Sequence, residues 1–143
     1  MDSSVLRKLN HVAVLVRDLP AAVERYTRVL GGKLVEEQHL PGSGADVAVI
    51  ELGGAHIELL STRQPGSKVA TLLSERGEGI HHLSFEVGDI EAAMAELRNV
   101  GIALRDQTPR PGLHDRRIAF LEPRDTCGVL IELVEENLNR TSE

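Results

Sequence analysis

Hydrophobic and polar residues alternate in short segments along the chain. This period-two pattern predicts β-strands, because successive strand side chains point to opposite faces of a sheet. The opening segments of the two halves of the chain are residues 11–16 and 82–87. Six further strands are predicted at residues 33–38, 47–52, 56–60, 103–107, 117–121 and 129–134. We therefore expect two groups of four strands, one group in each half.

Apolar residues at helical spacing follow each opening strand. An aspartate, Asp18 or Asp89, comes just before each pattern, where its carboxylate can accept hydrogen bonds from the free N–H groups of a first helical turn. Gly31 and Gly101 come after the two patterns and are typical of helix ends. A third, shorter helix is predicted over residues 67–76. The predicted order is βαβββ, present twice, which defines an α+β fold.

Two polar residues recur at equivalent points of the repeat. His11 in the first half corresponds to His82 in the second at a spacing of 71 residues, and Glu58 corresponds to Glu132 at a spacing of 74 residues. In a fold built from two equal modules, equivalent residues converge across a pseudo-twofold axis. We therefore expect two histidines and two glutamates to meet at one point.

Two imidazoles and two carboxylates suit a divalent ion such as zinc, cobalt, nickel or manganese. Glu132 is the strongest of these candidates, because its strand neighbours on both faces are apolar and a buried carboxylate is costly unless it is paired, protonated or bound to a cation. Taken singly, the others have simpler interpretations. His11 fits a structural, hydrogen-bonded histidine, Glu58 an exposed edge-strand carboxylate, and His82 a solvent-facing side chain.

Composition narrows the classes of function. The chain has 143 residues, a formal net charge of −6, two Phe, one Tyr and no Trp. This argues against nucleic-acid binding, because there is no basic surplus and almost no aromatic surface for stacking bases. No apolar run approaches the roughly 20 residues needed to cross a membrane. The first residues do not resemble a secretory signal. A single cysteine, Cys127, excludes an intramolecular disulfide and fits a reducing compartment. We expect a cytoplasmic protein.

The remaining candidates lie in a loop rich in Gly and Pro. Arg110, Arg116 and Arg117 would suit an anionic group such as phosphate, although a charged loop is usually solvated. His114 in the same loop is interpreted as a solvated side chain. Cys127 has no base beside it in the sequence pattern, so we do not interpret it as a nucleophile.

Four segments carry a family resemblance: LNHVA at residues 9–13, GEGIHH at 77–82, PRPG at 109–112 and FLEPRDTCGVLIEL at 120–133. With the repeated βαβββ order, they make the chain resemble the vicinal oxygen chelate superfamily, and within it the methylmalonyl-CoA epimerases. The resemblance implies one domain over residues 1–143, with modules at roughly 8–62 and 79–135. It also implies tandem βαβββ modules that form a curved mixed sheet around a metal-binding cleft.

The resemblance implies a function and a site as well. His11, Glu58, His82 and Glu132 would bind a divalent metal ion, and Glu132 would also be catalytic. The reaction would be metal-dependent epimerisation of methylmalonyl-CoA at C2 through an enolate, in a homodimer. Some epimerases have a second acid/base glutamate where this chain has Val47. The second proton-transfer group is therefore left open.

Three other functions are compared with the sequence. A glyoxalase I-type lyase acting on a glutathione hemithioacetal would use a similar ligand set and similar enolate chemistry. An extradiol dioxygenase fits less well, because it uses a site of two histidines and one carboxylate that binds iron. A non-enzymatic binding protein of the bleomycin-resistance type fits less well too, since such proteins commonly lack the metal ligands.

Overall fold

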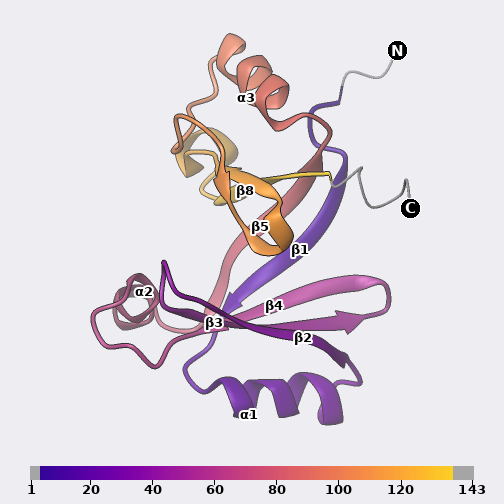
Figure 1. Ribbon diagram of the computed structural model, residues 1–143, viewed down its shortest axis with the longest axis vertical. Helices are drawn as coiled ribbons and strands as arrows, with labels where there is room; N and C mark the ends of the chain where they lie inside the picture. Colours follow the sequence, from indigo (N-terminus) through magenta and orange to yellow (C-terminus); the bar gives the residue numbers. More distant parts are fainter. Residues whose placement is uncertain (1–3, 137–143) are drawn as a thin grey trace. The chain divides into compact units, whose positions relative to one another are not determined.

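The structure is a computed structural model that describes residues 4–136. Its strands are β1 (Lys8–Leu15), β2 (Lys33–Leu40), β3 (Ala45–Leu52), β4 (Ala55–Ser61), β5 (Gly79–Val87), β6 (Arg110–Pro111), β7 (Arg117–Phe120) and β8 (Ile131–Glu135) (Figure 1). Its α-helices are α1 (Leu19–Glu24), α2 (Lys68–Arg76) and α3 (Ile90–Asn99). A π-helical turn, Arg25–Val29, continues α1, and short 3-10 turns lie at Leu113–Asp115 and Pro123–Thr126. The predicted α+β class is confirmed.

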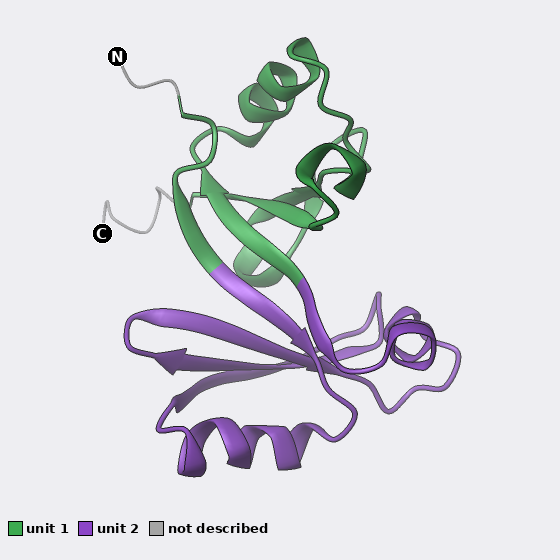
Figure 2. Ribbon diagram, turned by 180° about the vertical axis from the view of Figure 1, so that it is seen from behind, with its two compact units in different colours: residues 1–10, 82–143 green, residues 11–81 purple. Residues whose placement is uncertain are grey.

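The chain divides into two compact units (Figure 2). Unit 2 is His11–His81, and unit 1 contains the described parts of Met1–Asn10 and His82–Glu143. The boundaries fall inside β1 and β5, so each of these strands contributes residues to both units.

Each unit has a mixed sheet with the same pairing pattern. In unit 2 the strand order is β2-β3-β4-β1, with β1 and β4 parallel and the other pairs antiparallel. In unit 1 the order is β5-β8-β7-β6, with β5 and β8 parallel and the other pairs antiparallel. The start of β1 lies beside β5 in unit 1, where the Arg7 N–H donates to the Glu86 carbonyl at 2.9 Å. The predicted βαβββ order is therefore present twice.

The helix ends follow the predicted capping chemistry. The Asp18 carboxylate accepts a hydrogen bond from the Ala21 N–H at 3.0 Å, and the Asp89 carboxylate accepts from Glu91 and Ala92 at 3.0 and 3.1 Å. Gly31 and Gly101 both have φ of +90°, a conformation that costs glycine little because it has no Cβ.

One predicted strand is wrong. Residues 103–107 form only an isolated bridge between Leu104 and Leu121, and the second strand of the later βαβββ set is β6 instead. In this segment, aspartate carboxylates accept hydrogen bonds from backbone N–H groups that would otherwise pair with a neighbouring strand. Asp125 accepts from the Ala103 N–H at 2.8 Å, and Asp106 accepts from the Phe120 N–H at 2.8 Å. Such side-chain bonds compete with regular pairing.

The core of unit 2 lies between α1 and one face of the β2-β3-β4-β1 sheet (Figure 1). Its buried members are Val16, Ala48, Ile50 and Leu59. Because side chains alternate along a strand, the neighbours of these residues point to the opposite face of the sheet. That second face of unit 2, which we call face A, contains His11, Ala13, Val47, Val49 and Glu58.

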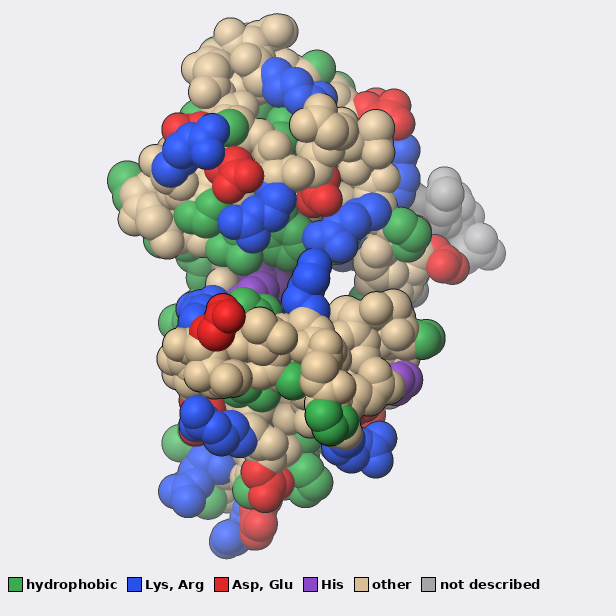
Figure 3. Space-filling view, turned by 90° about the vertical axis from the view of Figure 1, so that its left-hand side faces the viewer, with side chains coloured by type: hydrophobic (Ala, Val, Ile, Leu, Met, Phe, Trp, Pro, Cys, Tyr) green, Lys and Arg blue, Asp and Glu red, His purple; other side chains and the backbone are tan. Residues whose placement is uncertain are grey.

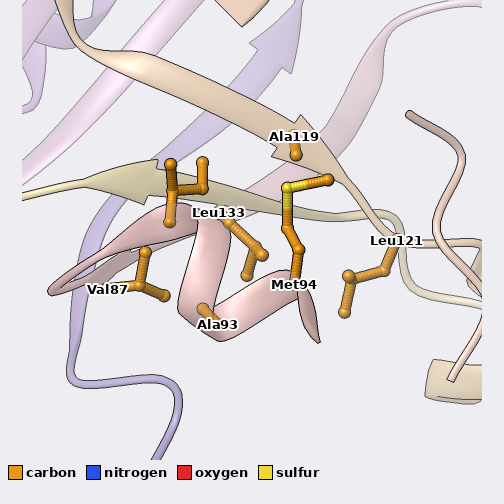
Figure 4. Packing of buried hydrophobic residues seen from close by; sticks show 7 residues of the cluster. Val87, Ala93, Met94, Ala119, Leu121 and Leu133 are labelled. Atoms are coloured by element: carbon orange, nitrogen blue, oxygen red, sulfur yellow. The ribbon is translucent and has the colours of Figure 1, made fainter. Parts of the chain in front are cut away.

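Unit 1 repeats this arrangement with α3. Ala93 and Met94 of the helix pack against sheet residues that include Val87, Ala119 and Leu133 (Figure 4). Alternation places the residues between these on the opposite face, which we call face B. Face B contains His82, Ser84, Phe120 and Glu132. In each unit, therefore, a helix covers one sheet face, and the predicted ligands lie on the other.

Candidate functional site

Face A holds the first predicted histidine–glutamate pair. His11 on β1 is 7% exposed, and its Nδ1 lies 3.2 Å from Oε2 of Glu58 on β4. The register explains the meeting, because Glu58 is the cross-strand partner of Ala13, two residues from His11 on the same face. Glu58 also lies on an inner strand, between β1 and β3, so the interpretation as an exposed edge-strand carboxylate is wrong.

Face B holds the second pair. Nε2 of His82 on β5 lies 3.7 Å from Oε1 of Glu132 on β8, and both side chains are 8% exposed. The register again explains it, because Glu132 pairs with Ser84, two residues from His82. The Phe120 ring packs edge-on against the His82 ring, with 5.3 Å between centroids. His82 is thus buried, and the solvent-facing interpretation is wrong.

Burial changes the proton affinity of Glu132. Loss of solvation raises the pKa of its carboxyl from the ordinary 4.5 to about 7, because the charged form is disfavoured away from water. The nearby Ser84 hydroxyl and the Arg110 guanidinium lower this pKa, and Asp106 raises it. At neutral pH Glu132 is therefore poised between its protonated and ionised forms.

The donor types fit a divalent metal ion. His11, His82 and Glu132 are buried residues that together offer two imidazole nitrogens and a carboxylate oxygen, and Glu58 adds a second carboxylate next to His11. Such a mixed nitrogen and oxygen set suits borderline divalent ions. A cation would also compensate the cost of keeping two carboxylates largely away from water.

The position of Val47 is also settled within unit 2. Val47 is 2% exposed and pairs with Leu60, two residues from Glu58, so it lies on face A. An acid at that position would lie on the same face as His11 and Glu58, but valine has no proton to transfer. The neighbouring Asp46 points to the other face, where the His39 ring and the Arg63 guanidinium lower the pKa of its carboxyl.

The three loop arginines all lie beside carboxylates. Arg110 is 3.1 Å from Asp106 and stacks over the Phe120 ring, with 5.4 Å from its guanidinium carbon to the ring centroid. Arg116 is 3.8 Å from Glu86. Arg117 donates to Glu135 and Glu91 at 2.9 and 3.0 Å. On the face drawn in Figure 3, Lys and Arg side chains are interspersed with Asp and Glu side chains.

The other residues singled out from the sequence have these positions. His114 adopts φ of +61° within the loop after β6. Cys127 is exposed, with φ of +60° in the turn before β8. Within residues 4–136, no helix is long and apolar enough to cross a membrane.

Comparison with known proteins gives concordant matches. Residues 10–120 match the family model described as Glyoxalase/Bleomycin resistance protein/Dioxygenase superfamily. The chain is 39% identical to the ethylmalonyl-CoA/methylmalonyl-CoA epimerase of Cereibacter sphaeroides, covering 90% of this chain and 98% of that protein.

Solved structures agree with these matches. The methylmalonyl-CoA epimerase of Mycobacterium tuberculosis is 35% identical, with a TM-score of 0.88, covering 100% of this chain and 97% of that one. The Streptomyces coelicolor methylmalonyl-CoA epimerase, in complex with 2-nitronate-propionyl-CoA, is 31% identical with a TM-score of 0.83, covering 92% and 98% of the two chains.

The chain belongs to the Glyoxalase/Bleomycin resistance protein/Dioxygenase superfamily. Within that superfamily, its similarity is to methylmalonyl-CoA epimerases over most of their length. The resemblance expected from the sequence is confirmed.

Proposed function

We propose that the protein catalyses metal-dependent epimerisation of methylmalonyl-CoA at C2. The observation that carries this proposal is two His–Glu contacts, one in each unit, at equivalent points of a repeated sequence. Both histidines and Glu132 are buried, and Glu58 is half-buried. They occur in a chain that is 39% identical to a protein named for this activity. The acyl-CoA complex of the Streptomyces coelicolor enzyme supports the substrate class.

We further propose that His11, Glu58, His82 and Glu132 bind one divalent ion together. Two arguments support a shared ion. The four residues offer nitrogen and oxygen donors in the mixture that borderline ions prefer. The four residues also recur at equivalent points of the sequence repeat. Cobalt, zinc, nickel and manganese all suit these donors.

The chemistry follows from the acidity of the substrate. The C2 proton of methylmalonyl-CoA lies between a thioester and a carboxylate, so its loss places negative charge on the thioester oxygen. A divalent ion held by these four residues would stabilise that charge as it develops. Glu132 then acts as the base that removes the proton. Without a metal ion, burial raises the pKa of this carboxyl to about 7. A bound cation would lower it, so that the carboxylate is ionised and able to accept the proton.

The other residues prepare the site. His82 lies against Glu132 and is held by the edge-on Phe120 ring, which limits the rotation of the imidazole. On face A, the contact between His11 and Glu58 holds both side chains in position. Burial of these groups keeps bulk water away and strengthens every charge interaction among them.

We also propose, on family grounds, that the protein is a homodimer. We propose that it acts in the cytoplasm, because its single cysteine fits a reducing compartment. We propose further that residues 1–143 form one domain, and the passage of β1 and β5 through both units supports this. Size-exclusion chromatography with light scattering tests the homodimer directly.

Proton NMR of methylmalonyl-CoA in deuterated water tests the activity. With protein loaded with cobalt, we expect deuterium to replace the C2 proton faster than in samples without protein or treated with a chelator. Glu132→Gln should abolish the metal-dependent exchange, whereas Glu96→Gln, at an exposed position on α3, should leave it unchanged.

The same experiment can also contradict the proposed epimerase activity. No exchange above the chelator-treated control, with cobalt bound, would exclude epimerisation. Turnover of the glutathione hemithioacetal of methylglyoxal by the same sample would then assign a glyoxalase I-type activity. Metal binding without turnover of either compound would favour a non-enzymatic binding protein.

A further inference from the structure

Inversion at C2 requires a second proton-transfer group. A single base can remove a proton and return it to the same side of the planar enolate, but the opposite configuration forms only when a proton arrives from the other side. Glu132 accounts for one group. Val47 cannot be the other, although it lies on face A, two residues along β3 from the partner of Glu58.

The strand register places another carboxylate on face A. Glu36 of β2 pairs with Val49 of β3, and Val49 pairs with Glu58 of β4. Residues paired across strands point to the same face. Since neighbouring strands lie about 4.8 Å apart, the Cα atoms of Glu36 and Glu58 are separated by roughly 10 Å. Both side chains can therefore reach toward the space above Val49.

A β-bulge gives Glu36 this orientation. Leu34 pairs with Ile50, but Glu36 pairs with Val49, so one residue of β2 is left without a partner. Without the bulge, Glu36 would pair with Ala48, which packs in the core beneath α1. Bulges often re-aim a side chain toward a functional site. Here the bulge turns a carboxylate from the helix-covered face to the face that carries His11 and Glu58.

The surroundings of Glu36 also set it apart from its neighbours. Glu36 is half-buried, whereas Glu37 and Gln38, which follow it on β2, are exposed. Gln38 donates a side-chain hydrogen bond to the Glu36 carboxylate. This bond comes from the same face and limits the positions that the carboxylate can adopt.

We propose that Glu36 is the second proton-transfer residue of the epimerisation, an inference that rests on the proposed function. In one direction, Glu132 takes the C2 proton as the C–H bond breaks and its electron pair enters the enolate. Protonated Glu36 then gives its proton to C2 from the other side, and the new C–H bond uses that electron pair. In the reverse direction, Glu36 is the base and Glu132 is the acid. Protons and electrons balance in both directions.

The test separates exchange from inversion. A stereochemically pure sample of methylmalonyl-CoA is incubated with cobalt-loaded Glu36→Gln in deuterated water. Deuterium at C2 and the configuration at C2 are then followed together. We expect the variant to exchange deuterium into one epimer, because Glu132 is intact. We expect inversion to be about 100-fold slower or more, the usual contribution of a positioned acid or base.

Matched variants complete the experiment. Glu37→Gln, next to it on the strand but facing the other side, should invert at the wild-type rate. Glu36→Asp should keep part of the inversion, because it retains a carboxyl group, and this distinguishes proton transfer from structural damage.

Wild-type inversion rates in Glu36→Gln would overturn the inference. Loss of exchange from both epimers, with cobalt still bound, would overturn it too, because Glu132 alone should sustain exchange from one of them. Failure of the proposed function gives a different result, in which the wild-type protein itself shows no metal-dependent exchange.

Discussion

At Glu132, the stability of the fold and the chemistry of the site depend on the same buried carboxyl. Its side chain is 8% exposed, and its pKa is raised from 4.5 to about 7 by burial. Below pH 4.5 the group is protonated in both the folded and the unfolded chain and has no effect. Between pH 4.5 and 7 the unfolded chain releases the proton while the folded chain retains it. Stability therefore falls as pH rises through this window.

We predict that the metal-free protein loses up to about 3 kcal/mol of unfolding free energy from this group between pH 4.5 and pH 8. Urea unfolding of wild type and Glu132→Gln across that range measures it. The difference between the two proteins should grow with pH, because glutamine cannot ionise and the other titrating groups are common to both. Parallel pH profiles would show that Glu132 ionises normally in the folded chain.

At the scale of the element, capping and alternation explain most of the fold. The α3 helix begins where Asp89 accepts hydrogen bonds from two backbone N–H groups. We predict that Asp89→Ala lowers the free energy of unfolding by about 1 kcal/mol, since it leaves those donors without the carboxylate. Urea unfolding is the measurement. Glu96→Ala on the exposed side of the same helix should change it by less than about 0.5 kcal/mol. Equal effects of the two substitutions would show that the cap does not stabilise α3.

The sequence predicted the elements whose capping residues and hydrophobic alternation both indicate the same structure. Both aspartate caps and the positions of β1 to β4 follow from it. The strand expected at residues 103–107 fails because the Asp106 and Asp125 side chains take hydrogen bonds that a ladder would use. The orientation of Glu36 could not be predicted from the sequence either, because the alternation of hydrophobic and polar residues does not show where a β-bulge occurs. Period-two alternation shows which residues share a sheet face with His82, but it does not show whether that face is buried or exposed to solvent.

At the scale of the whole molecule, one repeated plan accounts for both units. In each unit a helix covers one sheet face, and a His–Glu pair lies on the other face. The four residues were predicted from the spacing of the repeat alone. The family, the fold and the acyl-CoA epimerases that the chain resembles are consistent with a shared metal centre. The central claim is that the two pairs bind the same ion.

Cobalt titration of the metal-free protein, followed by calorimetry, tests that claim most directly. We predict one ion per chain, and at least about a tenfold loss of affinity in both His11→Ala and His82→Ala, although these residues belong to different units. Urea unfolding of each variant confirms that it is folded. Binding of two ions per chain, or full affinity in either variant, would contradict the binding of one shared ion.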